Sequence, residues 1–145
     1  MEIKIINKSN NALPKYESEH AAGMDLRAYI NEPVILEPFK RAIIPTGIYI
    51  KIPVGCEAQI RPRSGLAANH GITVLNTPGT IDSDYFGEVK IILINLGDTA
   101  FKIENNDRIA QMVFNRYESA EMYPVDVFNE TTERGEGGFG STGIK

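Results

Sequence analysis

Two arginines and a serine stand where a short helix is predicted to begin. The stretch RPRSGLAANHG carries Arg61 and Arg63 around a proline, then Ser64, good helix formers and a closing Gly71. A helix start offers free N–H groups and a partial positive charge, both of which favour phosphate. Arg63, the Ser64 hydroxyl and the amides of Ser64 and Gly65 would then bind an anion. The alternative is an N-cap serine with two surface arginines.

Acidic residues follow a Pro-Gly turn in the stretch VLNTPGTIDSDYFGE, at residues 74–88. Both ends of this stretch resemble strands, which predicts a hairpin. Asp82, Asp84 and Glu88 lie on its returning arm. A carboxylate beside an isoleucine in such a hairpin can act as a general base that positions a water molecule. The alternative is turn chemistry, in which Asp and Ser side chains bond to their own backbone.

A lone carboxylate, Asp25, stands between apolar neighbours in AGMDLRA, on a predicted strand. With a period of two it shares a face with Gly23 and Arg27. A surface ion pair with a basic residue is the simplest interpretation. A contact to a hard metal ion is the sharper one, since Mg²⁺ prefers oxygen ligands and keeps several waters. His20 and His70 are isolated, so no zinc site is predicted.

The glycine-rich end RGEGGFGSTGIK, residues 134–145, combines groups that suit a nucleotide. Glycine amides can wrap phosphates, and Ser141 and Thr142 can donate hydroxyl hydrogens to them. Arg134 adds a fixed positive charge, and Phe139 can stack on a planar base. The stretch lacks the spacing and the lysine of a Walker A motif. The alternative is a disordered end without function.

Short runs of alternating apolar residues separated by proline and glycine predict an all-β sandwich or barrel. The run at 88–95 is nearly continuous, which is typical of a strand covered on both faces. One short helix is expected at 64–71, and the apolar period is lost after about Glu130. The predicted strands are EIKII (2–6), IYIKI (48–52), EVKIILIN (88–95), RIAQMVF (108–114) and YPVDVF (123–128).

Composition narrows the class of protein. The chain has 145 residues, which suits one domain, and its net charge of −4 argues against a general nucleic-acid-binding surface. Cys56 is the sole cysteine, so an internal disulfide is impossible. The start lacks a signal-peptide pattern, and no apolar stretch is long enough to span a membrane. We therefore expect a cytoplasmic protein that acts without nucleic acid or membrane partners.

Phosphate donors, a carboxylate base, a possible metal contact and an aromatic platform together describe a nucleoside triphosphate site. The motifs AGMDLRA, RPRSGLA, LNTPGTIDSDYFGE, DRIAQM and RGEGGFGSTG occur in this order. In their order and spacing the chain resembles the trimeric dUTP pyrophosphatases (dUTPases) along essentially its whole length. The resemblance implies Mg²⁺-dependent hydrolysis of dUTP to dUMP and pyrophosphate, which keeps uracil out of DNA and supplies dUMP for dTMP synthesis.

The resemblance also implies a fold, which is a jelly-roll-like β-barrel at 1–133 with one short helix. A flexible glycine-rich arm at 134–145 would close over the active site. Three copies would form a homotrimer whose active sites are shared, with the arm and the predicted hairpin coming from different subunits.

By the same resemblance, Asp82 would orient the attacking water. Asp25 would contact Mg²⁺ through water, the ion being held mainly by the substrate phosphates. Tyr85 would lie under the deoxyribose and exclude a 2′-hydroxyl, Phe139 would cover the uracil, and Gln111 would contact phosphates from a neighbouring chain. The other implied substrate-binding residues are Arg63, Ser64 and Gly65 at the helix start, Asn76, Gly79, Thr80, Ile81 and Lys90 along 76–90, and Arg134, Gly140, Ser141 and Thr142 in the tail.

Two positions depart from the family pattern. Asn106 stands where the family often has glycine, and asparagine tolerates the positive φ that such a turn needs. Phe86 stands where a polar or basic residue is common. Two other functions remain open. A dCTP deaminase-like enzyme would need a glutamate on the strand VKIILIN, which has none, and a non-catalytic trimeric nucleotide sensor would not need Asp82.

Overall fold

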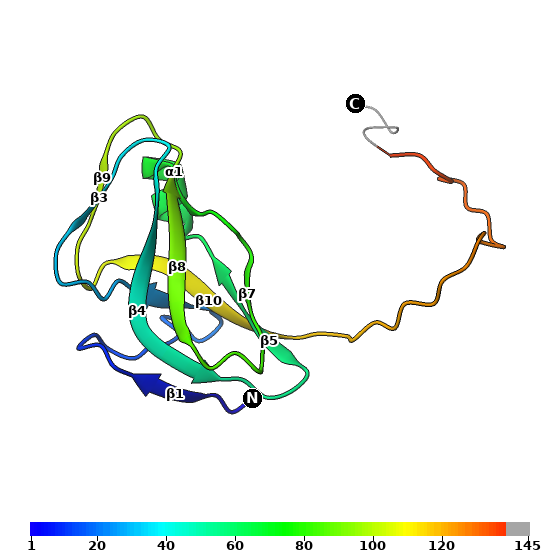
Figure 1. The fold of residues 1–145 in the computed structure, drawn as a ribbon, viewed down its shortest axis with the longest axis horizontal. Coiled ribbons are helices and arrows are strands. Elements are labelled where there is room, and N and C mark those ends of the chain that lie inside the picture. The colour runs from blue at the N-terminus through cyan, green and yellow to red at the C-terminus, as the bar shows by residue number, and fades with distance from the viewer. Residues whose placement is uncertain (139–145) are drawn as a thin grey trace.

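Antiparallel strands build almost all of the regular structure (Figure 1). The computed structural model describes residues 1–138. The elements are β1 (Lys4–Asn7), β2 (Gly23–Arg27), β3 (Val34–Leu36), β4 (Arg41–Lys51), β5 (Cys56–Arg61), α1 (Ser64–His70), β6 (Ile72–Val74), β7 (Gly79–Ile81), β8 (Glu88–Asn95), β9 (Phe101–Ile103) and β10 (Arg108–Arg116). The expected all-β class with one short helix is therefore confirmed.

Two four-stranded sheets face each other across one apolar core. The first has the order β1-β4-β8-β6, the second has the order β2-β10-β5-β7, and β3 pairs with β9 in a separate two-stranded sheet. Among residues 1–138 no hydrogen-bonded ladder joins the two large sheets, so the expected barrel is not closed. Both sheets contribute to the same buried cluster, which packs them together without such a ladder.

Alternation along the strands places the core. Ile48 and Ile50 in β4, with Ile52 just beyond it, are each 3% exposed, as the period of two predicts. β8 buries every second residue from Val89 onward, and Ile92 and Ile94 on its outer face remain partly exposed. The prediction that this strand is covered on both faces is therefore wrong for the single chain.

The helix α1 begins and ends close to where its sequence predicts. Arg63 takes the N-cap position with extended dihedrals and makes no side-chain cap hydrogen bond, so Ser64 is the first helical residue rather than the cap. Gly71 ends the helix in the left-handed conformation (φ 67°), and its N–H donates to the Ala67 carbonyl. At seven residues, α1 is too short to cross a membrane, and residues 1–138 contain no other helix.

The hairpin predicted at residues 74–88 does not form around its Pro-Gly turn. β6 pairs with β8 in the first sheet, whereas β7 pairs with β5 in the second. The Pro-Gly turn between β6 and β7 therefore carries the chain from one sheet to the other. Alternation marks both segments as strands, but each finds its ladder partner elsewhere in the fold, which local spacing does not encode.

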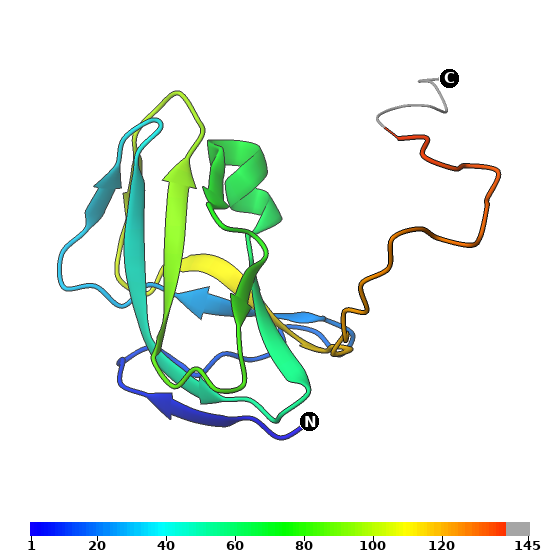
Figure 2. The same cartoon turned by 45° about the vertical axis from the view of Figure 1, so that its right-hand side comes forward.

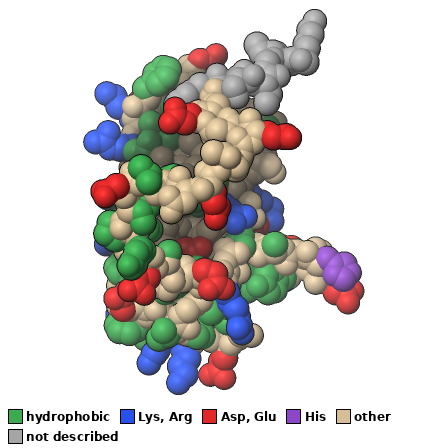
Figure 3. Space-filling view, turned by 90° about the vertical axis from the view of Figure 1, so that its right-hand side faces the viewer, with side chains coloured by type: hydrophobic (Ala, Val, Ile, Leu, Met, Phe, Trp, Pro, Cys, Tyr) green, Lys and Arg blue, Asp and Glu red, His purple; other side chains and the backbone are tan. Residues whose placement is uncertain are grey.

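After Arg116 the chain leaves the sheets as an extended arm with no helix or strand up to Gly138 (Figures 1 and 2). The predicted strand at 123–128 is wrong for this chain, because no strand within 1–138 lies beside it. Its Tyr123 and Phe128 side chains are 87% and 89% exposed. Figure 3 shows the molecule from the side of the arm, where apolar side chains are exposed among acidic and basic ones.

Candidate active site

The strand register brings three of the predicted site residues together. β10 lies between β2 and β5, so Gln111 pairs with Asp25 on one side and with Arg61 on the other. Arg63 follows two residues after Arg61, where α1 begins. Asp25, Gln111 and the helix start are separated by more than 35 residues in sequence, yet they form one cluster at the end of the second sheet.

Two guanidinium groups hold the Asp25 carboxylate. Arg63 Nε donates to Asp25 Oδ1 at 2.9 Å, and Arg108 Nη1 donates to Asp25 Oδ2 at 3.2 Å. The Asp25 side chain is 17% exposed, and those of Arg63 and Arg108 are 26% and 45% exposed. The interpretation of Asp25 as a member of an ion pair is therefore confirmed. Its partners are Arg63 and Arg108, whereas Arg27 on the same strand is not one of them. Arg108 was missed from sequence; its position three residues before Gln111 in DRIAQM was the available signal.

Removing the charge of Asp25 should destabilise the fold measurably. In an Asp25→Asn variant one amide N–H₂ group would face a guanidinium, so a charged hydrogen bond becomes a donor–donor contact. We expect the free energy of unfolding in urea to fall by about 1–2 kcal/mol.

The matched control is Glu104→Gln, which removes the exposed Lys102–Glu104 ion pair at 2.7 Å. Its cost should be below about 0.5 kcal/mol because both side chains are more than half exposed. Equal effects of the two substitutions would contradict a structural role for the Asp25 pairs.

Gln111 is tied to the same cluster by its side chain. Its Nε2 donates to the Pro62 carbonyl at 3.0 Å, between the two arginines of RPR. Gly23, on β2, leaves the space that the Gln111 amide fills, because a Cβ there would overlap Gln111 Oε1. Gln111 therefore lies with the helix start of its own chain, where Arg63, Ser64 and Gly65 present their donors.

The second group of predicted residues lies around β7. The Asn76 amide packs against Gly79, with its nitrogen 3.2 Å from where a Cβ at Gly79 would stand. Asp82 directly follows β7 and is exposed, and none of the ion pairs within residues 1–138 involves it. Its carbonyl accepts a hydrogen bond from the Tyr85 N–H at 3.1 Å. A turn therefore links Asp82, the candidate general base, to Tyr85, the residue expected under the sugar. Thr80 and Ile81 of β7 directly precede this turn.

In one chain the two groups lie toward opposite ends of β5. Ile81 pairs with Ala58, so Asp82 lies near the start of β5, whereas Arg63 lies beyond its last residue, Arg61. At about 3.3 Å per strand residue the separation exceeds about 10 Å. A single subunit therefore does not bring Asp82 to the phosphate donors of its own helix start.

The remaining predicted residues join neither group. Lys90 lies on β8, with its Nζ 3.8 Å from Glu88 Oε2. Arg134 lies on the arm, where its Nε donates to the Gly137 carbonyl at 2.9 Å. Phe139, Gly140, Ser141 and Thr142 lie outside the described residues.

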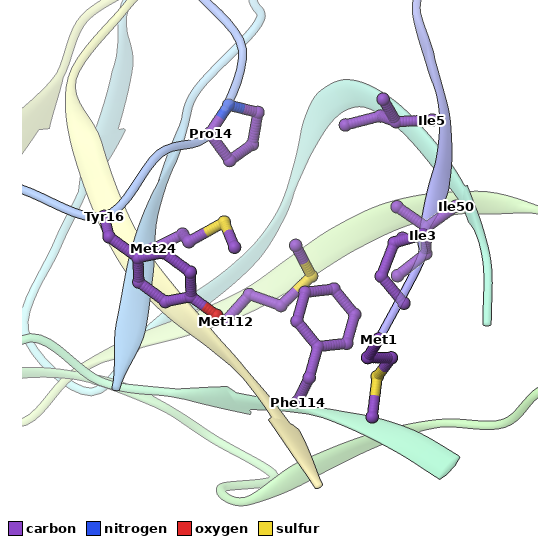
Figure 4. Close-up of a pocket in the computed structure, with 9 residues that line it drawn as sticks. All are labelled: Met1, Ile3, Ile5, Pro14, Tyr16, Met24, Ile50, Met112 and Phe114. Atoms are coloured by element: carbon purple, nitrogen blue, oxygen red, sulfur yellow. The ribbon is translucent and has the colours of Figure 1, made fainter. Parts of the chain in front are cut away.

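A separate apolar cavity of about 380 Å³ lies beside β1 and contains none of the predicted site residues (Figure 4). Figure 4 shows side chains from β1, β2, β4 and β10 converging on it, including Ile5, Met24, Ile50 and Met112. None of the side chains that line it is charged, so it is not the candidate active site. Within residues 1–138 no three potential metal-ligating side chains cluster either.

A family model described as dUTPase matches residues 9–143. The chain belongs to the dUTPase family. Two proteins named deoxyuridine 5'-triphosphate nucleotidohydrolase are similar to it along almost their whole length. The one from Cytophaga hutchinsonii is 55% identical over 141 residues, covering 97% of this chain and 91% of that protein. The one from Finegoldia magna is 56% identical over 143 residues, covering 99% of each.

Solved structures of dUTPases share the fold. A variant of the Staphylococcus bacteriophage 80alpha dUTPase with dUpNHpp has a TM-score of 0.88 and 26% identity, covering 99% of each chain. The same phage enzyme with dUPNHPP has a TM-score of 0.85 and 28% identity, also covering 99% of each. The chain is therefore an enzyme of the dUTPase family with the family's β-clip fold, and a hydrolase of nucleotide metabolism.

Proposed function

We propose that this dUTPase-family protein hydrolyses dUTP to dUMP and pyrophosphate. The observation that carries the proposal is its similarity, at about 55% identity over nearly the full length, to enzymes named for this substrate. The product would supply dUMP for dTMP synthesis, and removal of dUTP would keep uracil out of DNA. The geometry of the two residue groups supports the proposal at the level of individual steps.

The triphosphate would bind at the cluster around the start of α1. Arg63 and the Ser64 and Gly65 amides carry donors and positive charge there, and Gln111 lies beside them. Asp25 holds Arg63 in place through the hydrogen bond at 2.9 Å. A guanidinium fixed in this way is preorganised for phosphate oxygens, which lowers the reorganisation needed on binding.

The residues present fit a magnesium ion carried mainly by the substrate. No three-ligand cage exists within residues 1–138, so the ion would be held chiefly by phosphate oxygens. Each Asp25 oxygen accepts one guanidinium hydrogen bond and retains lone pairs that can accept from a metal-bound water. When bound, Mg²⁺ would neutralise phosphate charge and hold the triphosphate of the substrate in the orientation needed for in-line attack. Such neutralisation would help a triphosphate bind to a protein whose net charge is −4.

Asp82 would orient the attacking water. The water oxygen forms a bond to the α-phosphorus, the bond from that phosphorus to the bridging oxygen breaks, and pyrophosphate leaves with the electron pair. The proton of the water passes to the Asp82 carboxylate. An exposed carboxylate without an ion-pair partner in the described part of the chain is free to accept this proton.

Residues 76–90 would select the base and the sugar. Backbone groups along this segment can match the edge of uracil and mismatch cytosine, whose exocyclic amine is a donor. Asn76, held against Gly79, would add a side-chain contact. Tyr85 would lie beneath the deoxyribose, where the space left is too small for a 2′-hydroxyl.

A homotrimer would complete each site. The separation between Asp82 and Arg63 along β5 supports an arrangement in which the base of one subunit would meet the helix start of another. The arm can supply the third contribution, because residues 117–138 extend away from the sheets and could span at most about 80 Å. Its exposed apolar residues, including Tyr123 and Phe128, lack partners within 1–138 and would pack on a neighbouring subunit.

The proposal predicts a narrow substrate range. The protein should be incubated with dUTP, dCTP, dTTP and UTP in the presence of Mg²⁺ while pyrophosphate and ammonia are measured. We expect pyrophosphate from dUTP at a rate at least about 100-fold above that from the other nucleotides, because each lacks a match to the base or sugar pocket. Ammonia release from dCTP would instead indicate a deaminase, and tight dUTP binding without turnover would indicate a sensor.

A further inference from the structure

A side chain at Gly87 would collide with the side chain of Tyr85, two residues earlier in the sequence. The φ of Gly87 lies outside the left-handed region, so its backbone does not require glycine. A Cβ at this position would nevertheless overlap the Tyr85 hydroxyl and Cζ and stand 2.9 Å from Cε2, and these are the three nearest atoms. The Tyr85 ring therefore rests on the bare backbone of Gly87.

Tyr85 is held in this position through both its backbone and its side chain. Its backbone N–H donates to the Asp82 carbonyl at 3.1 Å, and its hydroxyl donates to the Glu88 carbonyl at 3.0 Å. Glu88 is itself anchored to the first sheet, because its Oε1 accepts the Gly47 N–H at 2.8 Å. The Tyr85 side chain remains 45% exposed, so one part of it is seated and another part faces outward.

We propose that Gly87 is a specificity-determining position for the sugar. It would act through Tyr85, by letting the ring lie back against the backbone at the depth where deoxyribose fits above it and a 2′-hydroxyl does not. The inference rests on the proposed function, in which Tyr85 is the platform under the sugar. Gly87 would be a positioning residue, because its effect on the sugar would pass through the Tyr85 ring.

A methyl group at Gly87 would push the Tyr85 ring away from the Gly87 backbone and break the hydrogen bond from the Tyr85 hydroxyl to the Glu88 carbonyl. In a Gly87→Ala variant we expect the ratio of kcat/KM for dUTP to that for UTP to fall about 10-fold, the effect of about one misplaced methylene-sized contact. Most of the change should come from a lower kcat/KM for dUTP. An unchanged or raised ratio would overturn the inference.

A double-mutant cycle isolates the route through Tyr85. Adding Gly87→Ala to a Tyr85→Ala background should change the dUTP-to-UTP ratio by less than about twofold, because the group that it displaces is gone. A full 10-fold effect in that background would show that Gly87 acts by another route and would overturn the inference.

Gly97→Ala is the matched steric control. Gly97 also lies outside the left-handed region, and a Cβ there would stand 2.5 Å from the His70 carbonyl oxygen. It lies beyond the opposite end of β8 from Gly87. This variant should lower the melting temperature and leave the dUTP-to-UTP ratio of kcat/KM unchanged. That result would separate a loss of stability from a loss of discrimination. A ratio lowered as far as by Gly87→Ala would overturn the inference. Failure of the wild-type protein to hydrolyse dUTP would refute the proposed function, whereas normal discrimination by Gly87→Ala would refute this inference alone.

Discussion

An Asp82→Asn variant should bind dUTP with nearly the wild-type affinity and hydrolyse it at least about 100-fold more slowly. Asparagine has the same shape as aspartate but cannot accept a proton from water. The side chain is exposed at the end of β7 and makes no ion pair within residues 1–138, so its replacement removes no structural contact of that kind. The Tyr85 turn uses the Asp82 backbone carbonyl, which the substitution leaves in place.

The measurement pairs turnover with binding. Pyrophosphate release would give kcat, and calorimetric titration with a non-hydrolysable dUTP analogue would give Kd. Asp84→Asn is the matched control, because Asp84 is an exposed carboxylate in the same turn. Its kcat should stay within about twofold of wild type, since the proposed mechanism uses no group of the Asp84 side chain. Similar losses in the two variants would mean that Asp82 acts through general charge rather than as the base.

Removing residues 134–145 should reduce kcat/KM for dUTP at least about 100-fold, because several phosphate donors and the cover over the base are lost together. Arg134 illustrates why the fold should survive. Both of its described hydrogen bonds are to Gly137 on the same arm, and it makes no ion pair within residues 1–138. None of residues 134–138 belongs to the buried core, so the Asp25 cluster and Asp82 should stay as they are.

Light scattering after size exclusion should give three times the chain mass for both proteins, the full-length chain being 16.0 kDa. The melting temperatures of the two should also agree within a few degrees. Deletion of residues 144–145 alone is the control, because these lie beyond the motif RGEGGFGSTG, and it should leave activity nearly unchanged. Normal turnover by the longer deletion would show that the tail is dispensable, and a monomeric product would assign the loss to assembly.

Local pattern was sufficient for much of the fold. The buried positions of β4 follow from the alternation of Ile48, Ile50 and Ile52, because side chains on a strand alternate between faces wherever its partners lie. The end of α1 at Gly71 follows from the ease with which glycine adopts a left-handed conformation. Asn106 adopts a φ of 71°, so it preserves the turn expected where the family has glycine.

Sequence by itself determined several of the strands, the place of the helix and, through five ordered motifs, the family, but it also predicted a strand at 123–128 that does not form. Only the tertiary structure decided that β6 and β7 belong to different sheets, that Arg108 shares Asp25 with Arg63, and that Gly87 makes room for Tyr85. The physical reason is the range of the interactions. Periodicity and turn chemistry act over a few residues, whereas ladder partners, ion pairs and ring contacts depend on which distant segments the core brings together.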